Sequence, residues 1–157
     1  MATLSGRAQI FSGDTSSVDS TLMHPLGTRA CDTAGNEYIY LTGVASTAIG
    51  SWVVFDEAHL TTLTVANVKG RVAVAMAATI ASTYGWYQIY GKNIVAKGTS
   101  GSIDDNDKLW VTATAGVVDD TDVATDLVFG AIARSADSSG VFTVELNYPI
   151  CHNEVIN

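Results

Sequence analysis

The chain has 157 residues, of which 47% are apolar and only 15% are charged, so it can form one domain with a substantial core. Its 16 acidic and 8 basic residues give a net charge of −8 without any basic cluster, which argues against nucleic-acid binding because phosphate contacts need several Lys or Arg on one face. A transmembrane-length apolar run and a signal-peptide pattern are both absent, so we expect a protein made in the cytoplasm and not inserted in a membrane.

Residues 1–21 contain few large apolar side chains and many Ser, Thr, Gly and Asp. Such a segment cannot form its own core, so we predict an extended N-terminal arm that becomes ordered where it lies on another surface. A disordered tail without a role is the alternative interpretation. Residues 22–148 are predicted to form the folded domain, and residues 149–157 a short C-terminal tail.

From Glu37 onward, apolar and polar residues alternate with a period of two, as in strands with one buried face. Turns rich in Asp, Asn, Ser and Gly separate these segments. About eight or nine short strands at this spacing predict an all-β, single-domain antiparallel sandwich or barrel-like domain. The predicted strands are residues 37–43, 50–56, 61–66, 70–77, 85–91, 93–97, 109–113, 127–134 and 142–148.

Two segments leave a choice between strand and helix. Alanines within residues 72–82 could carry a short helix, and residues 56–60 could form a single helical turn. Both segments are short, so the all-β prediction does not depend on them.

Residues 84–92, with the sequence YGWYQIYGK, place aromatic and large apolar residues between glycines without a single acid. Strict alternation would put Trp86 and Tyr90 on one face and Tyr87 on the other, which predicts a strand buried on two sides, in the domain or at a subunit contact. A carbohydrate-stacking strip is the alternative interpretation of these aromatic residues. The residues predicted as a possible interface are Tyr84, Trp86, Tyr87, Tyr90 and Trp110.

Potential metal ligands occur in no recognised pattern. Seven aspartates fall within residues 104–107 and 119–126, but neither group has the D-x-D/N-x-D/N-G spacing or a nearby glutamate of a calcium loop. We interpret both groups as solvated acidic turns. His24, His59 and His152 are too scattered for a zinc site, so neither a metal nor another cofactor is predicted.

Catalytic patterns are also absent from the sequence. No GxSxG nucleophile elbow occurs, and the glycines at 43–50 and 98–101 are not followed by the GKS or GKT of a phosphate-binding loop. We therefore predict that the protein is not an enzyme. Cys31 and Cys151 lack C-x-x-C spacing and are expected to be two thiols, at least one of them packed, although a disulfide between them stays open.

Four segments together resemble a known family. Residues 26–41 combine LGT, a short strand, a D-x-x-G turn and an aromatic strand; residues 84–92 form the aromatic segment; residues 103–118 combine a turn, a strand and AGV; and residues 128–133 are an apolar strand with a glycine. This combination resembles the capsid decoration, or cement, proteins of tailed bacteriophages, over roughly residues 22–148. The resemblance implies a homotrimer that binds the major capsid protein at subunit junctions on the capsid exterior and stabilises the shell.

The N-terminal arm fits such a role, because an extended segment can lie across a neighbouring subunit and enlarge the interface. The main rival is a phage receptor-binding or glycan-binding β module with the same fold. A glycan site would need exposed aromatic residues beside Asp or Asn, whereas a cement protein would have them occluded. A tail-tube or head-connector protein is less favoured, because the long hairpins of such rings are not found in the sequence.

Overall fold

The computed structural model describes residues 13–152, which form an all-β chain without a helix. This confirms the predicted fold class. The strands are β1 (Val18–Asp19), β2 (Arg29–Cys31), β3 (Glu37–Thr42), β4 (Trp52–Phe55), β5 (Thr61–Leu63), β6 (Gly70–Ala75), β7 (Tyr84–Lys97), β8 (Lys108–Val111), β9 (Val118–Asp119), β10 (Leu127–Ala133) and β11 (Val141–Cys151).

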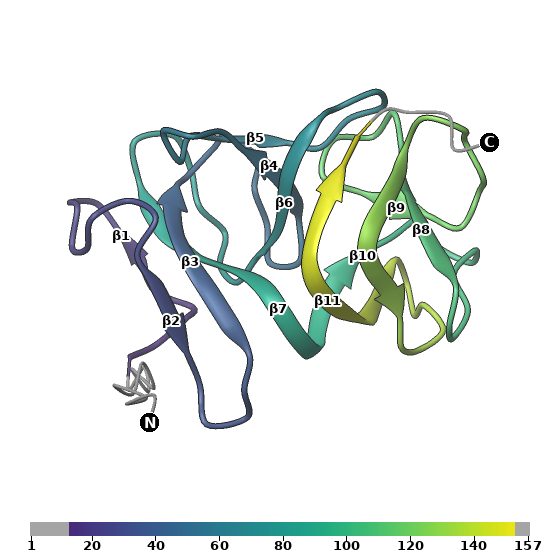
Figure 1. Cartoon of the computed structure of the whole chain (residues 1–157), viewed down its shortest axis with the longest axis horizontal. Coiled ribbons are helices and arrows are strands. Elements are labelled where there is room, and N and C mark those ends of the chain that lie inside the picture. Colours follow the sequence, from purple (N-terminus) through teal and green to yellow (C-terminus); the bar gives the residue numbers. More distant parts are fainter. Residues whose placement is uncertain (1–12, 153–157) are drawn as a thin grey trace, which may run out of the picture.

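The 11 strands belong to one antiparallel sheet with the main order β2-β3-β7-β6-β11-β10-β8-β9. In addition, β1 pairs with β7, and β4 pairs with both β5 and β6. The long strands β7 and β11 pair with each other and bend through the molecule, so that they join the side formed by β1–β6 to the side formed by β8–β10 (Figure 1). The result is a sandwich-like single domain whose sheet does not close into a barrel.

Two hydrophobic cores lie on the two faces of β4 and β6. Every residue of β4 is buried, as expected for the continuous apolar run WVVF in a strand covered on both faces. Trp52 and Val54 belong to the larger core, which contains residues of β7, β8, β10 and β11. Val53 and Phe55 belong to a second core with residues of β3 and β7. The pair β4–β6 is therefore the middle layer of the domain.

Neither of the two possible helices forms. After β6 ends at Ala75, the backbone N–H of Met76 donates to Trp86 O at 3.2 Å, so the chain stays paired with β7 instead of turning into a helix. In residues 56–60, Asp56 Oδ1 accepts hydrogen bonds from the N–H groups of Ala58 and Leu60, both at 2.9 Å. This side-chain capping replaces helical backbone bonding with a tight turn.

The element boundaries also differ from the predicted ones. The two strands expected at 85–91 and 93–97 form the single strand β7, and β11 continues beyond residue 148, through Pro149, to Cys151. Within the predicted arm, residues 13–21 include β1. The rest of the arm and residues 153–157 lie outside the described residues.

Candidate functional site

Most of the aromatic strand predicted as an interface is buried inside the domain. Trp86 and Tyr87 lie on opposite faces of β7, with 2% and 0% of their surface exposed. The Tyr87 hydroxyl lies 2.8 Å from Thr79 Oγ1 and donates to Thr42 O at 3.2 Å, so its polar end is satisfied within the second core. Both residues are core residues and cannot form an exposed interface.

Trp86 belongs to what we call the covered aromatic cluster, formed by Tyr38, Tyr40 and Trp86 on the outer face of β3 and β7. The Tyr40 and Trp86 rings are 5.1 Å apart, and the half-buried Tyr84 ring is stacked 6.3 Å from Tyr40. A cluster this rich in aromatic area would be a strong binding surface if nothing lay over it.

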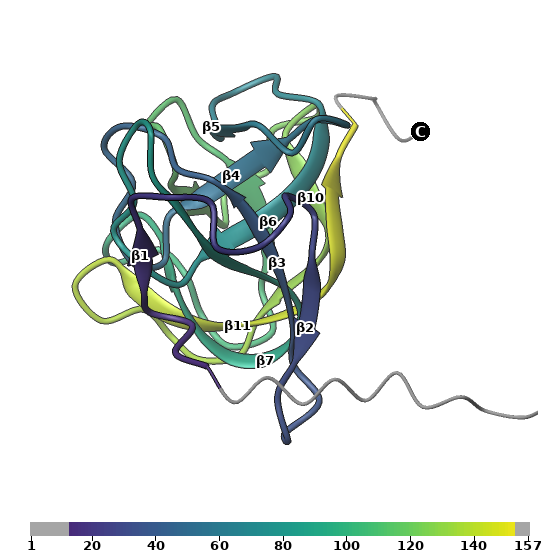
Figure 2. The ribbon, with the colours of Figure 1, turned by 90° about the vertical axis from the view of Figure 1, so that its left-hand side faces the viewer.

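Residues 13–28, the N-terminal segment, cover this cluster. Figure 2 shows the segment passing from β1 across β3 to β2. The His24 ring packs 5.1 Å from Tyr40 and 5.3 Å from Trp86, and the Tyr40 hydroxyl donates to Asp19 Oδ2 at 2.6 Å. Val18 pairs with Gly85 of β7. Part of the predicted arm thus lies on its own domain.

The two tyrosines of the cluster have raised pKa values. Burial, followed by the hydrogen bond to Asp19, raises the pKa of Tyr40 to about 12. Burial likewise raises the pKa of Tyr38 to about 12, helped by its hydrogen bond to Asp32. Both phenols are therefore neutral hydrogen-bond donors over the physiological pH range.

The N-terminal segment also exposes large apolar side chains, which we call its outward apolar side, next to the exposed polar residues Ser20 and Thr21. Val18, Leu22 and Met23 are 42%, 53% and 63% exposed, which is unusual for large apolar side chains so close together in a sequence. The segment therefore covers the aromatic cluster and leaves three large apolar side chains in contact with water.

A second aromatic feature lies open on the surface. The rings of Tyr90 and Tyr148, the open tyrosine pair, are stacked with centroids 5.2 Å apart and are 38% and 46% exposed. The Arg29 guanidinium lies 5.8 Å from the centre of the Tyr148 ring. Burial, together with a hydrogen bond from the hydroxyl to Glu37, raises the pKa of Tyr148. The pair is therefore exposed while Tyr148 is also in contact with Arg29 and Glu37.

Tyr148 was not among the predicted interface residues, and a bulge in β11 explains why. The β10–β11 register passes from Ala131 opposite Leu146 to Phe129 opposite Ile150, so residues 147–149 face the single residue Gly130. Tyr148 adopts a positive φ of 48° in this bulge. The sequence signals for it were the proline at 149, a residue tolerated in bulges, and Gly130 within the facing strand.

Beside the open tyrosine pair is an open hollow of about 370 Å³, the tyrosine hollow. Its floor follows β7 and β11, and its far wall is the turn between β2 and β3. Asn36 Oδ1 of this turn accepts a hydrogen bond from Lys92 N at 3.0 Å, an approach that a side chain at Gly91 would block. The lining residues are Ala34, Gly35, Asn36, Tyr90, Gly91, Lys92, Glu145, Leu146 and Asn147.

Trp110 lies apart from the other predicted interface residues. It is half-buried in β8, where it faces Leu127 and Asp119, on the opposite side of the molecule from β1 and β2 (Figure 1). The five predicted residues are therefore divided among the cores, the covered aromatic cluster, the open tyrosine pair and β8, and they do not form one surface.

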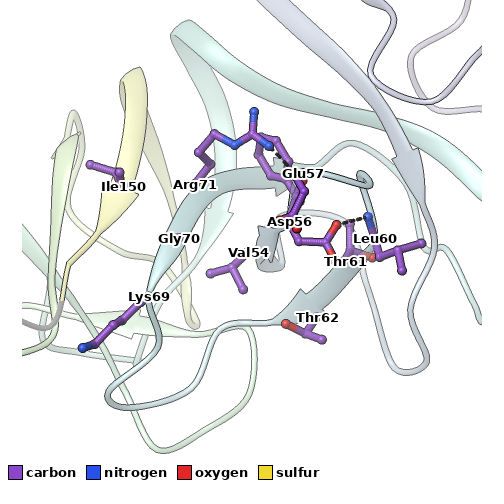
Figure 3. A pocket seen from close by; sticks show the side chains of 11 residues that line it. Val54, Asp56, Glu57, Leu60, Thr61, Thr62, Lys69, Gly70, Arg71 and Ile150 are labelled. Atoms are coloured by element: carbon purple, nitrogen blue, oxygen red, sulfur yellow. Dashed lines mark hydrogen bonds between the residues drawn. The ribbon is translucent and has the colours of Figure 1, made fainter.

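A wider hollow of about 770 Å³ lies at the edge formed by β4, β5 and β6. Figure 3 shows Val54 on its floor between Lys69 and Thr62. Arg71 stacks 4.5 Å from the centre of the Phe55 ring and donates to Asp56 O at 2.8 Å. Arg71 and Asp56 are thus engaged in local contacts, since Asp56 also accepts the backbone hydrogen bonds of its own turn.

Among residues 13–152, no group of three or more His, Cys, Asp or Glu side chains is placed to hold a metal. Cys31 and Cys151 are not joined by a disulfide. Cys151 is packed in the larger core, where burial raises the pKa of its thiol to about 12. Within the same residues, no helix has the length and apolar character needed to cross a membrane.

No protein-family model, curated protein or solved structure matches the chain. Its function is therefore inferred from its own residues and geometry.

Proposed function

We propose that the chain is a structural protein of a bacteriophage virion, which binds the outer surface of the capsid at subunit junctions and stabilises the shell. The four sequence segments that resemble cement proteins support this proposal, together with the antiparallel all-β fold. The observation that carries it is the outward apolar side of the N-terminal segment, where Leu22 and Met23 are more than half exposed.

Contact between this apolar side and a protein surface would bury side chains that the isolated chain leaves in water. Removing apolar surface from water contributes about 25 cal/mol per Å², and the affinity is what remains after the cost of ordering the two partners. The low charge of the chain adds to this, because few ionised groups would have to be desolvated on contact. The major capsid protein is the proposed partner.

Homotrimer formation belongs to the same proposal. A closed trimer at a symmetric junction presents three copies of the N-terminal segment at once, so that attachment of one copy raises the effective concentration of the others. Weak individual contacts then suffice for lasting attachment to an assembled shell, whereas an isolated capsid subunit offers a single weak contact.

The rival function, a glycan-binding module based on the strip Tyr84–Tyr90, has less support. It needs exposed aromatic faces, but Trp86 and Tyr87 are buried. Only the Tyr90 end of the strip, which is 38% exposed, could contact a carbohydrate.

Co-sedimentation with expanded capsids that lack the protein tests the proposal. We expect the wild-type chain to bind these particles, but not free capsid subunits, and the double variant Leu22→Ser, Met23→Ser to bind much more weakly. The matched control is Leu60→Ser, Val65→Ser, which changes two apolar residues that are 53% and 41% exposed on the β4–β6 side. Equal binding by all three proteins would contradict the assigned surface, and no binding by any of them would contradict the function.

A further inference from the structure

The tyrosine hollow has the composition of a small-molecule site rather than of a protein interface. Tyr90 supplies an aromatic wall and Ala34 and Leu146 small apolar areas, whereas the amide, amine and carboxylate groups come from Asn36, Lys92, Glu145 and Asn147. Its volume of about 370 Å³ falls at the lower end of the range typical of ligand pockets. We propose that this hollow binds a neutral saccharide, with Tyr90 as the stacking surface.

The aromatic wall is pre-organised. Tyr90 is stacked on Tyr148, whose ring lies below the Arg29 guanidinium and whose hydroxyl is bound to Glu37. An exposed tyrosine held in this way loses little side-chain entropy when a ligand covers it, so more of the contact energy appears as affinity. A flat ring with a polar hydroxyl edge suits a pyranose, which has an apolar C–H face and a rim of hydroxyl groups.

The polar groups lie where the hydroxyl rim would be. Asn147 is directly opposite Tyr90 in the β7–β11 ladder, and Lys92 and Glu145 complete the same rim. These groups supply both donors and acceptors, as sugar hydroxyls require. Asn36 has a different role. Because its side-chain amide is hydrogen-bonded to Lys92 N and to Asp32 Oδ2, it positions the turn that forms the wall.

The charges favour a neutral ligand. Lys92 and Glu145 balance each other on the rim, as do Arg29 and Glu37 behind the open tyrosine pair. Glu145 is also paired with Arg134 at 2.8 Å, and this additional positive charge is offset by Asp32, whose carboxylate accepts a hydrogen bond from Asn36 of the wall. The chain as a whole carries a net charge of −8, which repels acidic sugars.

The backbone around the hollow is shaped for close approach. A bulge in the β7–β11 ladder lies between Val144 and Leu146, and Gly91 has a φ of 110°, a conformation that side chains strongly disfavour. Bulges of this kind often occur beside binding sites, because they redirect side chains out of the regular ladder. The site is distinct from the outward side of the N-terminal segment and would operate whether or not that segment binds a capsid.

The experiment is an NMR titration of the full chain with the methyl pyranosides of glucose, mannose and galactose and with N-acetylglucosamine, followed by amide shifts. We expect weak binding of at least one of these sugars, with shifts confined to residues 34–37, 90–92 and 145–148. Tyr90→Ala should weaken this binding about tenfold, the effect of losing one ring contact. Val141→Ala, an exposed position of β11 outside the hollow, should bind as the wild type does.

Three results would overturn the proposal: no shifts with any neutral sugar at tens of millimolar, shifts on another surface, or binding that Tyr90→Ala leaves unchanged. Stronger binding of N-acetylneuraminic acid than of the neutral sugars would also contradict it, because the charge argument excludes this order. The amide shifts of Tyr90→Ala at residues outside the hollow, compared with those of the wild type, show whether the variant is folded. Capsid co-sedimentation of the same variant separates the two proposals, since it should remain at the wild-type level.

Discussion

Trp86 and Tyr90 lie four positions apart in the same strand, yet one belongs to the covered aromatic cluster and the other to the open tyrosine pair. Residues 13–28 lie over the first and leave the second uncovered. The comparison shows that an aromatic sequence alone does not decide between core and surface. What decides is which other segment of the chain lies over each ring.

A bulge separates the two regions. Tyr38 of β3 faces Gln88, but its neighbour Glu37 faces Tyr90, so Ile89 is an extra residue in β7. Because one extra residue moves the following side chains off the expected face, Tyr90 does not continue the row that begins at Trp86. The prediction that Trp86 and Tyr90 share a face is therefore wrong.

The largest expected effect comes from removing the indole of Trp86. Trp86→Ala should lower the free energy of unfolding by about 3–5 kcal/mol, because it leaves a cavity in the covered aromatic cluster. Tyr90→Ala should change it by less than about 1 kcal/mol, since that ring is partly exposed. Urea unfolding of both variants measures the difference, and similar losses would refute the distinction between the two regions.

Deleting residues 1–21 should have a smaller effect. It removes β1 and the Asp19–Tyr40 hydrogen bond, so we expect a loss of about 2 kcal/mol while the remaining sheet stays folded. Deletion of residues 1–12 alone is the matched control. Thermal unfolding that is identical for the wild type and the longer deletion would show that residues 13–21 do not stabilise the cluster.

Alkaline pH should weaken the covered aromatic cluster selectively. The pKa of Tyr40 is raised from its ordinary 10.0 to about 12, so its contribution to stability is complete below pH 10 and is lost as the pH rises from 10 to 12. Asp19→Asn removes the negative charge beside the phenol and should lower this pKa. Absorbance titration at the tyrosinate band measures the pKa of Tyr40, with Tyr40→Phe as the reference that identifies its signal. An unchanged Tyr40 pKa in Asp19→Asn would show that the carboxylate does not raise it.

The smallest effect is expected at the open tyrosine pair. Tyr148→Phe removes the hydroxyl that binds Glu37 but keeps the ring stacked on Tyr90. We expect a loss of less than about 1 kcal/mol, because the hydrogen bond is exposed to solvent. A loss as large as that of Trp86→Ala in urea unfolding would mean that the pair is part of the core.

The sequence was sufficient for the all-β class and for most strand positions, because period-two alternation and turn residues are local signals. It also indicated correctly that this strand is buried on both faces over residues 86–89, but not at Tyr90. It could not show the cover over Trp86, since His24 and Asp19 reach that cluster only through long-range contacts. Tyr148 was missed for a related reason: its exposure depends on the bulge opposite Gly130, which belongs to a different strand.

Hydroxyl-radical footprinting of the protein bound to capsids tests the central proposal most directly. Met23 and Tyr148 are both well exposed in the isolated chain, and both side-chain types react readily, so they report on the two regions in one experiment. We predict that capsid binding protects Met23 and leaves the oxidation of Tyr148 unchanged. Protection of Tyr148 with continued oxidation of Met23 would contradict the assignment of the capsid-binding surface to the N-terminal segment.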